Sequence, residues 1–222
     1  MAASYFDVDG TLVRTNLVHP TVYFMLNQQT PIHSLRRLGR ALLRAPAMAI
    51  AESRDRRTFN EMIFASYEGM SEDRYLELSR EAYAAVMKPH IYAGARDLVR
   101  RCRDLGHRVV LVSGALEELM RLFAEDIGAH EFIANRLELK DGRATGKLLR
   151  PIVAGPTKAR LVAEHARKSG FDLNDCYAYS DSYSDVPMLS VVGQPAAVNP
   201  DRKLAVLARA YDWPIIDLSV TV

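Results

Sequence analysis

Two carboxylates stand two residues apart near the start of the chain, in the stretch Phe6-Asp7-Val8-Asp9-Gly10-Thr11-Leu12. The apolar residues around them predict a short strand, and side chains at positions i and i+2 of a strand point to the same face. Asp7 and Asp9 can therefore converge on one bound group. Because two anions so close together are costly unless they share a cation or a proton, the pair indicates a metal site, an acid–base pair, or both. The competing interpretation is an ordinary Asp-x-Asp-Gly turn.

Three further groups of polar residues have the chemistry of a binding site. Ser113-Gly114 and the pair of Asp181 and Asp185 each follow a short apolar run, and Lys158 lies near the start of a predicted helix. Each group also has an ordinary interpretation. The serine and the two aspartates could cap helices, and the lysine could be a solvated surface residue.

The elements that would position these groups alternate along the chain. Short, almost wholly apolar runs are typical of strands buried on both faces of a parallel sheet, and helical segments separate them here. Asp141-Gly142 between two strand-like segments predicts a hairpin. We therefore expect an α/β fold, a Rossmann-like core with a parallel sheet. The expected strands are the run around 5–8, then 108–113, 132–134, 137–140, 143–149, 176–180, 196–198 and 213–216, and the expected helices are 94–105, 115–127, 156–169, 186–192 and 201–210.

The carboxyl ends of parallel strands meet at one edge of a sheet, where the ligand crevice of such folds lies. The pair of Asp7 and Asp9 follows the first strand, and Ser113-Gly114 follows the second. Asp181 follows a later strand, and Lys158 begins the helix before that strand. One crevice could therefore contain all of these groups. If they were only turn and cap residues, there would be no reason for them all to lie at this edge.

Residues 15–92 show helical periodicity and almost no strand pattern. They would interrupt the sheet after its first strand. The sequence therefore predicts an α/β core of residues 1–14 and 93–222 and an inserted, all-helical cap domain of residues 15–92. The helices expected within the insertion are 18–26, 32–44, 57–67 and 71–87.

The insertion is strongly basic between residues 36 and 57, where seven arginines accompany two acidic residues. The ordinary interpretation is a cap helix that packs its apolar face inward and solvates its arginines. The alternative is a weak contact with an anionic membrane surface, or guidance of an anionic substrate. Together with the apolar segment 18–26, this alternative makes a lipid phosphate a candidate ligand.

The composition is that of an ordinary globular protein, with 222 residues, 49% hydrophobic, 25% charged and a net charge of +2. The small charge and the lack of a known binding motif argue against a nucleic-acid partner. No apolar run approaches the roughly 18 residues of a membrane-spanning helix. Cys102 and Cys176 form no metal-ligand pattern and read as reduced thiols, so we expect a cytoplasmic protein. The oligomeric state stays open.

The order of the candidate groups resembles that of the haloacid dehalogenase-like phosphohydrolases. Within that superfamily the chain is similar to the phosphoserine-phosphatase-like branch, which carries a helical cap after strand one. The likeness covers most of the core and little of the insertion. It rests on Asp7-Val8-Asp9-Gly10-Thr11, Ser113-Gly114, Lys158 and Asp181-x-x-x-Asp185, with further similarity in the stretch 133–146.

The resemblance implies a Mg²⁺-dependent phosphohydrolase. Asp7 would attack the phosphorus and form an aspartyl-phosphate, and Asp9 would protonate the leaving alcohol and then activate water. The Mg²⁺ would lie between Asp7, Asp181 and the backbone carbonyl of Asp9, in the all-oxygen ligation that this ion prefers. Asp185 would orient a water on the metal.

The same resemblance implies how the phosphate is held. Ser113, the Gly114 amide and the helix N-terminus behind them would bind phosphate oxygens. The Gly10 amide and Thr11 would complete the cradle. Lys158 would neutralise charge on the nucleophile and on the phosphoryl group during transfer.

The chain departs from the family pattern in the part that would select the substrate. Phosphoserine phosphatases place an acidic residue shortly after the nucleophile to hold the substrate amine, and a cap arginine to hold its carboxylate. Here residues 14–19 contain no carboxylate and residues 60–64 contain no arginine, although Arg56 or Arg57 could serve. The serine-rich motif 180–185 is more like relatives that act on phosphatidylglycerophosphate or histidinol phosphate.

We therefore expect hydrolysis of a small-molecule or lipid phosphomonoester. The alternatives are a phosphoserine or histidinol-phosphate phosphatase, a phosphotransferase that uses the same aspartyl-phosphate, and a phospho-ligand-binding protein without turnover. The physiological substrate and its pathway stay open, since they depend on cap residues that the sequence does not place in space.

Overall fold

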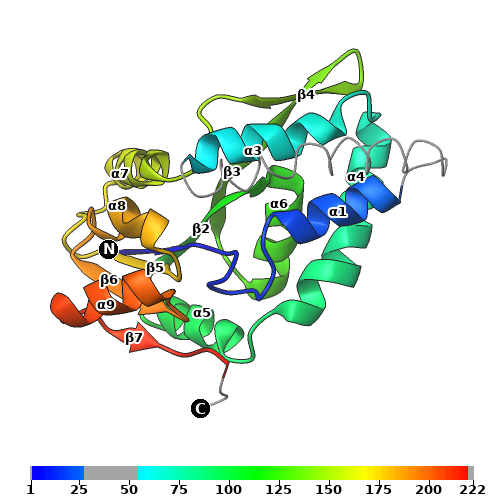
Figure 1. The fold of residues 1–222 in the computed structure, drawn as a ribbon. Coiled ribbons are helices and arrows are strands. Elements are labelled where there is room, and N and C mark those ends of the chain that lie inside the picture. The colour runs from blue at the N-terminus through cyan, green and yellow to red at the C-terminus, as the bar shows by residue number, and fades with distance from the viewer. Residues whose placement is uncertain (1, 28–54, 220–222) are drawn as a thin grey trace.

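The computed structural model describes residues 2–27 and 55–219. Within them a seven-stranded sheet has the order β4-β3-β2-β1-β5-β6-β7 (Figure 1). Neighbouring strands are parallel except β3 and β4, which form an antiparallel hairpin. The strands are β1 (Ala3–Phe6), β2 (Arg108–Leu116), β3 (Glu131–Lys140), β4 (Arg143–Leu149), β5 (Tyr177–Ser180), β6 (Gln194–Val198) and β7 (Ile215–Ile216).

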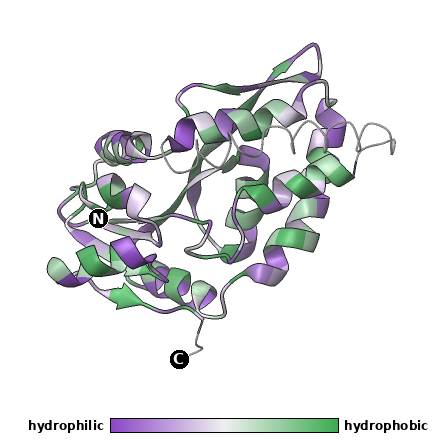
Figure 2. Ribbon diagram, viewed as in Figure 1, coloured by the Kyte–Doolittle hydropathy of each residue, from purple (hydrophilic) through white to green (hydrophobic). Residues whose placement is uncertain are grey.

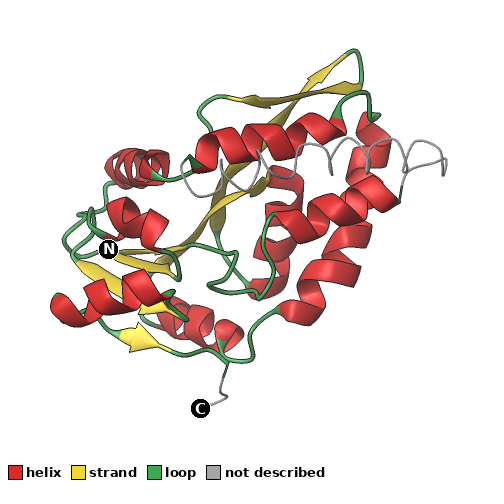
Figure 3. Cartoon of the chain, viewed as in Figure 1, coloured by secondary structure: helices red, strands yellow, loops and turns green. Residues whose placement is uncertain are grey.

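Alternating side chains of the central strands fill two separate cores. Phe6 and Leu111 point to one side and pack with α5 and α6. Tyr5 and Val110 point to the other side and pack with α7, α8 and α9. Figure 3 shows these helices on both sides of the strands, which is the layering expected of a parallel sheet. The helices are α5 (Ala95–Asp104), α6 (Glu117–Ile127), α7 (Pro156–Ser169), the short turn η4 (Tyr183–Asp185), α8 (Val186–Leu189) and α9 (Arg202–Ala210).

The helices of the inserted segment extend the first of these two cores. Phe24 and Leu78 are fully buried and belong to the same hydrophobic cluster as Met120 of α6. The α1 helix is coloured as largely hydrophobic in Figure 2, in keeping with its burial against this cluster. The elements are α1 (Val18–Leu26), α3 (Arg56–Phe64), the 3-10 turn η1 (Ala65–Tyr67), α4 (Glu72–Ala82), the π-helical turn η2 (Tyr83–Met87) and the 3-10 turn η3 (Lys88–His90).

The chain enters and leaves this helical segment at one place. The Arg14 N–H donates to the His90 carbonyl at 2.9 Å, and the Tyr92 N–H donates to the Leu12 carbonyl at 3.0 Å. Val13 and Ile91, which lie between these two bonds, form an isolated antiparallel bridge. Both ends of the insertion are therefore anchored to each other, just beyond the carboxyl end of β1.

Side-chain caps begin three of the helices. Asp55 accepts a hydrogen bond from a backbone N–H in the first turn of α3, as does Ser71 in α4 and Asp201 in α9. Such caps satisfy N–H groups that have no partner within the helix. The carboxylates of Asp55 and Asp201 are therefore engaged with the backbone of the helices that they begin.

The α/β class, the parallel sheet and the hairpin at Asp141-Gly142 are confirmed. Several strand predictions are wrong in extent. The first strand ends at Phe6, so Asp7 and Asp9 both follow it, and the last strand is only Ile215–Ile216. The β2 strand continues to Leu116, so the first two residues of the predicted helix 115–127 belong to the strand. The β3 strand is unbroken, so the predicted strands 132–134 and 137–140 are one element.

The β3 strand is one element because it pairs with β2 up to Asn135 and with β4 from Arg136 onward. The extent of β2 has a different cause. The pairing of β2 with β3 shifts register between Val112 and Leu116, so β2 resumes pairing after a bulge. At this irregularity the Asn135 amide donates to the Gly114 carbonyl at 2.7 Å. A bulge held by a tertiary hydrogen bond leaves no mark in the apolar pattern of a single strand.

Some predictions concern residues that are not described. The predicted helix 32–44 and most of the basic stretch 36–57 lie outside the described residues. Among residues 2–27 and 55–219, no helix has the length and hydropathy to span a bilayer. Cys102 and Cys176 are buried, free thiols.

The packing of α9 gives a test of the second core. Leu204 is fully buried, whereas Val206 on the same helix is 67% exposed. We expect Leu204→Ala to lower the free energy of unfolding by about 2–5 kcal/mol, because it opens a cavity. Val206→Ala should change that energy by less than about 0.5 kcal/mol. Urea unfolding measures both, and equal effects of the two substitutions would contradict this packing.

Candidate active site

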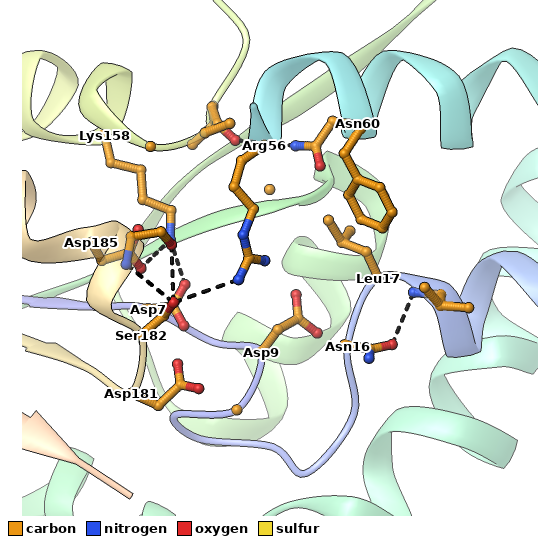
Figure 4. A pocket seen from close by; sticks show the side chains of 18 of the residues that line it. Asp7, Asp9, Asn16, Leu17, Arg56, Asn60, Lys158, Asp181, Ser182 and Asp185 are labelled. Atoms are coloured by element: carbon orange, nitrogen blue, oxygen red, sulfur yellow. Dashed lines mark hydrogen bonds and ion pairs between the residues drawn. The ribbon is translucent and has the colours of Figure 1, made fainter. Parts of the chain in front are cut away.

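A buried ion triad lies at the carboxyl end of β1. The Lys158 Nζ donates to Asp7 Oδ1 at 2.5 Å and to Asp185 Oδ2 at 2.7 Å (Figure 4). The three side chains are buried. Asp7 follows β1, the central strand of the sheet, Lys158 lies in the first turn of α7, and Asp185 lies at the start of α8. Three elements distant in sequence therefore meet at one lysine.

The triad depends on charge balance. Burial lowers the pKa of Lys158, but the carboxylates of Asp185 and Asp7 raise it above its ordinary value, so the ammonium stays charged. Burial raises the pKa of Asp7, and the charge of Lys158 opposes that rise. Removing one partner of such a group leaves an uncompensated buried charge. The lysine is therefore needed to keep Asp7 ionised in place.

Thr11 links Asp7 to a third carboxylate. Its hydroxyl lies 2.9 Å from Asp7 Oδ2 and 3.1 Å from Asp181 Oδ1, and it accepts a hydrogen bond from the Asp181 N–H at 2.9 Å. Burial raises the pKa of Asp181 to about 8, and the charge of Asp7 adds to this rise. Asp7 and Asp181 thus converge at a point where protein groups supply too little positive charge for both.

Asp9 is the fourth carboxylate of the site and lines the same pocket (Figure 4). Burial raises the pKa of Asp9 to about 7, and the charge of Asp7 adds to it. Lys158, Arg56 and a hydrogen bond from Ser113 act in the opposite direction. A carboxyl group with a pKa near 7 can both donate and accept a proton at neutral pH.

The end of β2 contributes Ser113 and Gly114 to the site. The Ser113 hydroxyl accepts from the Ala115 N–H at 3.0 Å within the strand, so it does not cap α6. Asn135 donates to the Gly114 carbonyl at 2.7 Å and accepts from the Val153 N–H at 2.7 Å. This buried asparagine ties the end of β2 to the loop that leads into α7.

The other capping interpretations also differ from what the structure contains. The hydroxyl of Ser182, and neither Asp181 nor Asp185, caps η4 by accepting the Ser184 N–H. Asp185 instead accepts hydrogen bonds from Lys158 and from the Ser180 hydroxyl, the latter at 2.9 Å. Both aspartates are thus turned toward the site rather than toward a helix end.

The predicted residues come together around one pocket of about 300 Å³. Thr11 and Ser113 do not line this pocket and are fully buried. Their hydroxyl groups contact the aspartates instead of facing the open space. The predicted residues that line the pocket are Asp7, Asp9, Gly10, Gly114, Lys158, Asp181 and Asp185.

The pocket is also lined by residues that the sequence analysis did not assign to the site. Arg56 and Asn60 reach it from α3, and Arg14 and Asn16 reach it from the loop after β1. Asn60 is 2% exposed, and its Oδ1 has no hydrogen-bond partner in the described part of the chain. No sequence signal shows which side of α3 faces the pocket, because that depends on how the helix packs.

Asn199 is a supporting residue that the sequence analysis missed. Its amide donates to the Thr11 carbonyl at 3.2 Å, and its Oδ1 accepts from the Leu218 N–H at 2.8 Å. Asn199 directly follows β6. It could have been found by the same rule that selected the other residues, since it is a polar side chain at the carboxyl end of a strand.

The donor set fits the Mg²⁺ ion that the resemblance implies. Asp7 and Asp181 converge on one hydroxyl, and burial raises the pKa of both carboxyls, so a cation bound between them would offset their repulsion. Among the described residues, there is no group of three or more His, Cys, Asp or Glu side chains that could hold a metal ion by itself. Mg²⁺ requires no such cage, since it commonly takes one or two carboxylates and keeps several waters.

Gly10 allows Asp181 to approach the loop. Its φ is +85°, and a Cβ atom at Gly10 would lie 2.2 Å from Asp181 Oδ2. We expect Gly10→Ala to displace the Asp181 carboxylate and to weaken Mg²⁺ binding. The measurement is the rise in melting temperature on adding Mg²⁺, since a ligand that binds only the folded state stabilises it.

Gly142→Ala is the matched control for this substitution. Gly142 has a φ of +70°, and a Cβ atom there would meet nothing within 4 Å. Both variants should lose stability of about 1–2 kcal/mol from the left-handed backbone. Only Gly10→Ala should also lose the Mg²⁺-dependent rise. An undiminished rise in Gly10→Ala would show that Asp181 does not need this space.

The chain was compared with known proteins. It matches the haloacid dehalogenase-like hydrolase family over residues 5–190. It is 33% identical over 220 residues to the phosphoserine phosphatase SerB1 of Mycobacterium tuberculosis, covering 99% of this chain and 71% of that protein.

Two solved structures share the fold. A Bordetella pertussis Tohama I protein of unknown function matches with a TM-score of 0.83 and 26% identity, covering 98% of each chain. An apo phosphoserine phosphatase matches with a TM-score of 0.69 and 18% identity, covering 99% of this chain and 94% of that one. With a family match over most of its length and this arrangement of carboxylates, the chain belongs to the haloacid dehalogenase-like hydrolases.

Proposed function

We propose that the chain is a Mg²⁺-dependent phosphomonoester hydrolase that works through an aspartyl-phosphate on Asp7. The observation that carries this proposal is the fixed carboxylate of Asp7. Its Oδ1 accepts from Lys158 and its Oδ2 from Thr11, in the same pocket as Asp9. A nucleophile held in one orientation beside a proton donor is what covalent phosphoryl transfer needs.

The first half of the reaction forms a bond between an Asp7 oxygen and phosphorus while the bond from phosphorus to the leaving oxygen breaks. Asp9, with its pKa raised to about 7, donates a proton to that leaving oxygen. In the second half Asp9 takes a proton from water, which attacks phosphorus and releases Asp7. Lys158 keeps a positive charge beside Asp7 throughout.

The remaining residues of the proposed site would hold the metal ion and the phosphate. Asp7, Asp181 and the backbone carbonyl of Asp9 would hold Mg²⁺, with Asp185 beside them. A bound Mg²⁺ would neutralise the phosphate oxygens. Gly114 lines the pocket and would offer its backbone N–H to the phosphate. Gly10 also lines the pocket, but its N–H donates to the Val13 carbonyl at 2.7 Å, so the phosphate-binding role expected of the Gly10 amide is not supported. Thr11 and Ser113 would act by holding the aspartates.

The inserted segment 15–92 would act as a cap over the core of residues 1–14 and 93–222. Its described residues supply one wall of the pocket, including Arg56 and Asn60. A wall that belongs to the insertion can exclude water from the reacting phosphate. The buried free thiols fit the reducing cytoplasm, which is the location we infer.

The substrate would be a small-molecule phosphomonoester, with a lipid phosphate as a second class. The relative named phosphoserine phosphatase makes phosphoserine the first compound to test. The pocket lining gives less support for that substrate, because its carboxylates among the described residues are Asp7, Asp9, Asp181 and Asp185. None of these is left to bind a substrate amine.

The proposed nucleophile, Asp7, gives a direct test of this function. Phosphate release from a panel of monoesters should require Mg²⁺, and Asp7→Asn should lower kcat more than about a thousandfold because the nucleophile is lost. The panel contains phosphoserine, histidinol phosphate, sugar phosphates, nucleotide monophosphates, lysophosphatidate and phosphatidylglycerophosphate. Asp104→Asn, on the exposed side of α5, is the matched control and should keep full activity. No Mg²⁺-dependent release from any compound would refute the proposal.

A comparison of two leaving groups separates proton donation by Asp9 from any effect of the substitution on folding. Asp9→Asn should lower the rate of the first half-reaction, phosphorylation of Asp7, about 10²–10⁴-fold for an alkyl phosphate, whose leaving alkoxide needs a proton. The loss should be much smaller for p-nitrophenyl phosphate, because nitrophenolate leaves without one. Single-turnover kinetics with the two compounds give the comparison. Equal losses for both would mean that Asp9 acts by some other route.

A further inference from the structure

A second cavity, of about 820 Å³, lies beside the active-site pocket. The two share lining residues, including Arg56 from α3 and Ser184 from the loop after β5. The remaining walls come from the starts of α3, α7 and α9. We call this cavity the vestibule. A substrate whose phosphate lies at Asp7 would have room for the rest of its leaving group here.

Four cationic side chains line the vestibule: Arg56 and Arg57 at the start of α3, and Arg202 and Lys203 at the start of α9. None of the four forms a salt bridge with a carboxylate in the described part of the chain. Arg56 has a neutral partner, the Ser182 hydroxyl at 3.5 Å. The positive charge of the cavity is therefore offset at a distance, through the effect of Arg56 on Asp9 and of Arg57 on Asp55, rather than in salt bridges.

The two acidic residues that line the vestibule, Asp55 and Asp201, form no salt bridge with the four cations in the described part of the chain. Asp55 accepts hydrogen bonds from the Arg57 N–H and the Thr58 hydroxyl, which lower its pKa. Asp201 accepts from the N–H groups of Tyr183 and Leu204, both at 2.8 Å. Both carboxylates are directed to the backbone as helix caps, while the cationic ends remain available to a ligand.

The placement of the cations is unfavourable for the helices themselves. Arginine and lysine in the first turn of a helix repel the positive end of its dipole, at a cost of about 0.3–1 kcal/mol each. Two helices that meet at one cavity both carry such residues. A bound anion would offset this repulsion at both helices at once.

We propose that the natural substrate carries a second phosphate in its leaving group and that the vestibule binds this phosphate. This inference rests on the proposed function. The first phosphate would lie at Asp7, and Arg56, which lines both spaces, would stand between the two phosphates. Arg57, Arg202 and Lys203 would bind the second phosphate. The same chemistry is offered by a soluble bisphosphate and by a phospholipid headgroup.

The kinetic test compares fructose 1,6-bisphosphate with fructose 6-phosphate. The wild-type kcat/KM should be at least about tenfold higher for the bisphosphate, and this preference should shrink with added salt, which screens exposed charges. The triple variant Arg57→Gln/Arg202→Gln/Lys203→Gln should raise KM for the bisphosphate about tenfold more than KM for the monophosphate. The control Arg101→Gln/Arg167→Gln/Arg209→Gln removes the same charge from exposed positions on α5, α7 and α9 and should leave the preference intact.

Binding measured without turnover separates this inference from the proposed reaction. Calorimetry with Asp7→Asn should show tighter binding of the bisphosphate, lost in the vestibule triple variant and kept in the control. This result would stand even if no compound were hydrolysed, an outcome that would refute only the proposed function. Hydrolysis of monoesters without any preference for the second phosphate would overturn the vestibule and leave the reaction standing.

A vesicle arm distinguishes the two sources of the second phosphate. Flotation would use phosphatidylcholine vesicles with and without phosphatidylglycerophosphate. Binding that requires the phosphorylated lipid and is lost in the vestibule triple variant assigns the second phosphate to a headgroup. Binding of the soluble bisphosphate alone assigns it to a soluble substrate. Binding of neither ligand overturns the proposal.

Discussion

The bonds from Lys158 to Asp7 and Asp185 are the interaction on which the rest of the site depends. The lysine is 6% exposed, so its charge is tolerated only because two carboxylates surround it. In turn, it holds one carboxylate at the end of β1 and another at the start of α8. The central strand and two helices of one face are thus registered against each other by a single ammonium group.

A site built on buried like charges needs rigid support behind it. Asn135 clamps the end of β2 to the loop before α7, and Asn199 holds the loop after β1 through the Thr11 carbonyl. Thr11 then positions two carboxylates through one hydroxyl. Burial of these amides and hydroxyls is affordable because each has partners, whereas an unpaired group would cost about 1–3 kcal/mol. The polar network behind the pocket keeps the aspartates close despite their mutual repulsion.

The sequence was sufficient for the parts that follow from local pattern. Apolar runs predicted the strands, and the rule that ligands bind at the carboxyl ends of parallel strands placed Asp7, Ser113 and Asp181 at one edge of the sheet. The bulge in β2 was not predictable, since it depends on a hydrogen bond from Asn135 on another strand. The positions of Arg56 and Asn60 depend on how α3 packs over the core, which periodicity alone does not determine.

The hydrogen bonds between residues 12–14 and 90–92 bring the two ends of the inserted segment together. An insertion that departs and returns at one point adds no strand to the sheet and changes no register within it. Its length and sequence can diverge between relatives while the core retains its strand order. In this architecture the wall of the pocket that the insertion supplies can change separately from the part that carries Asp7.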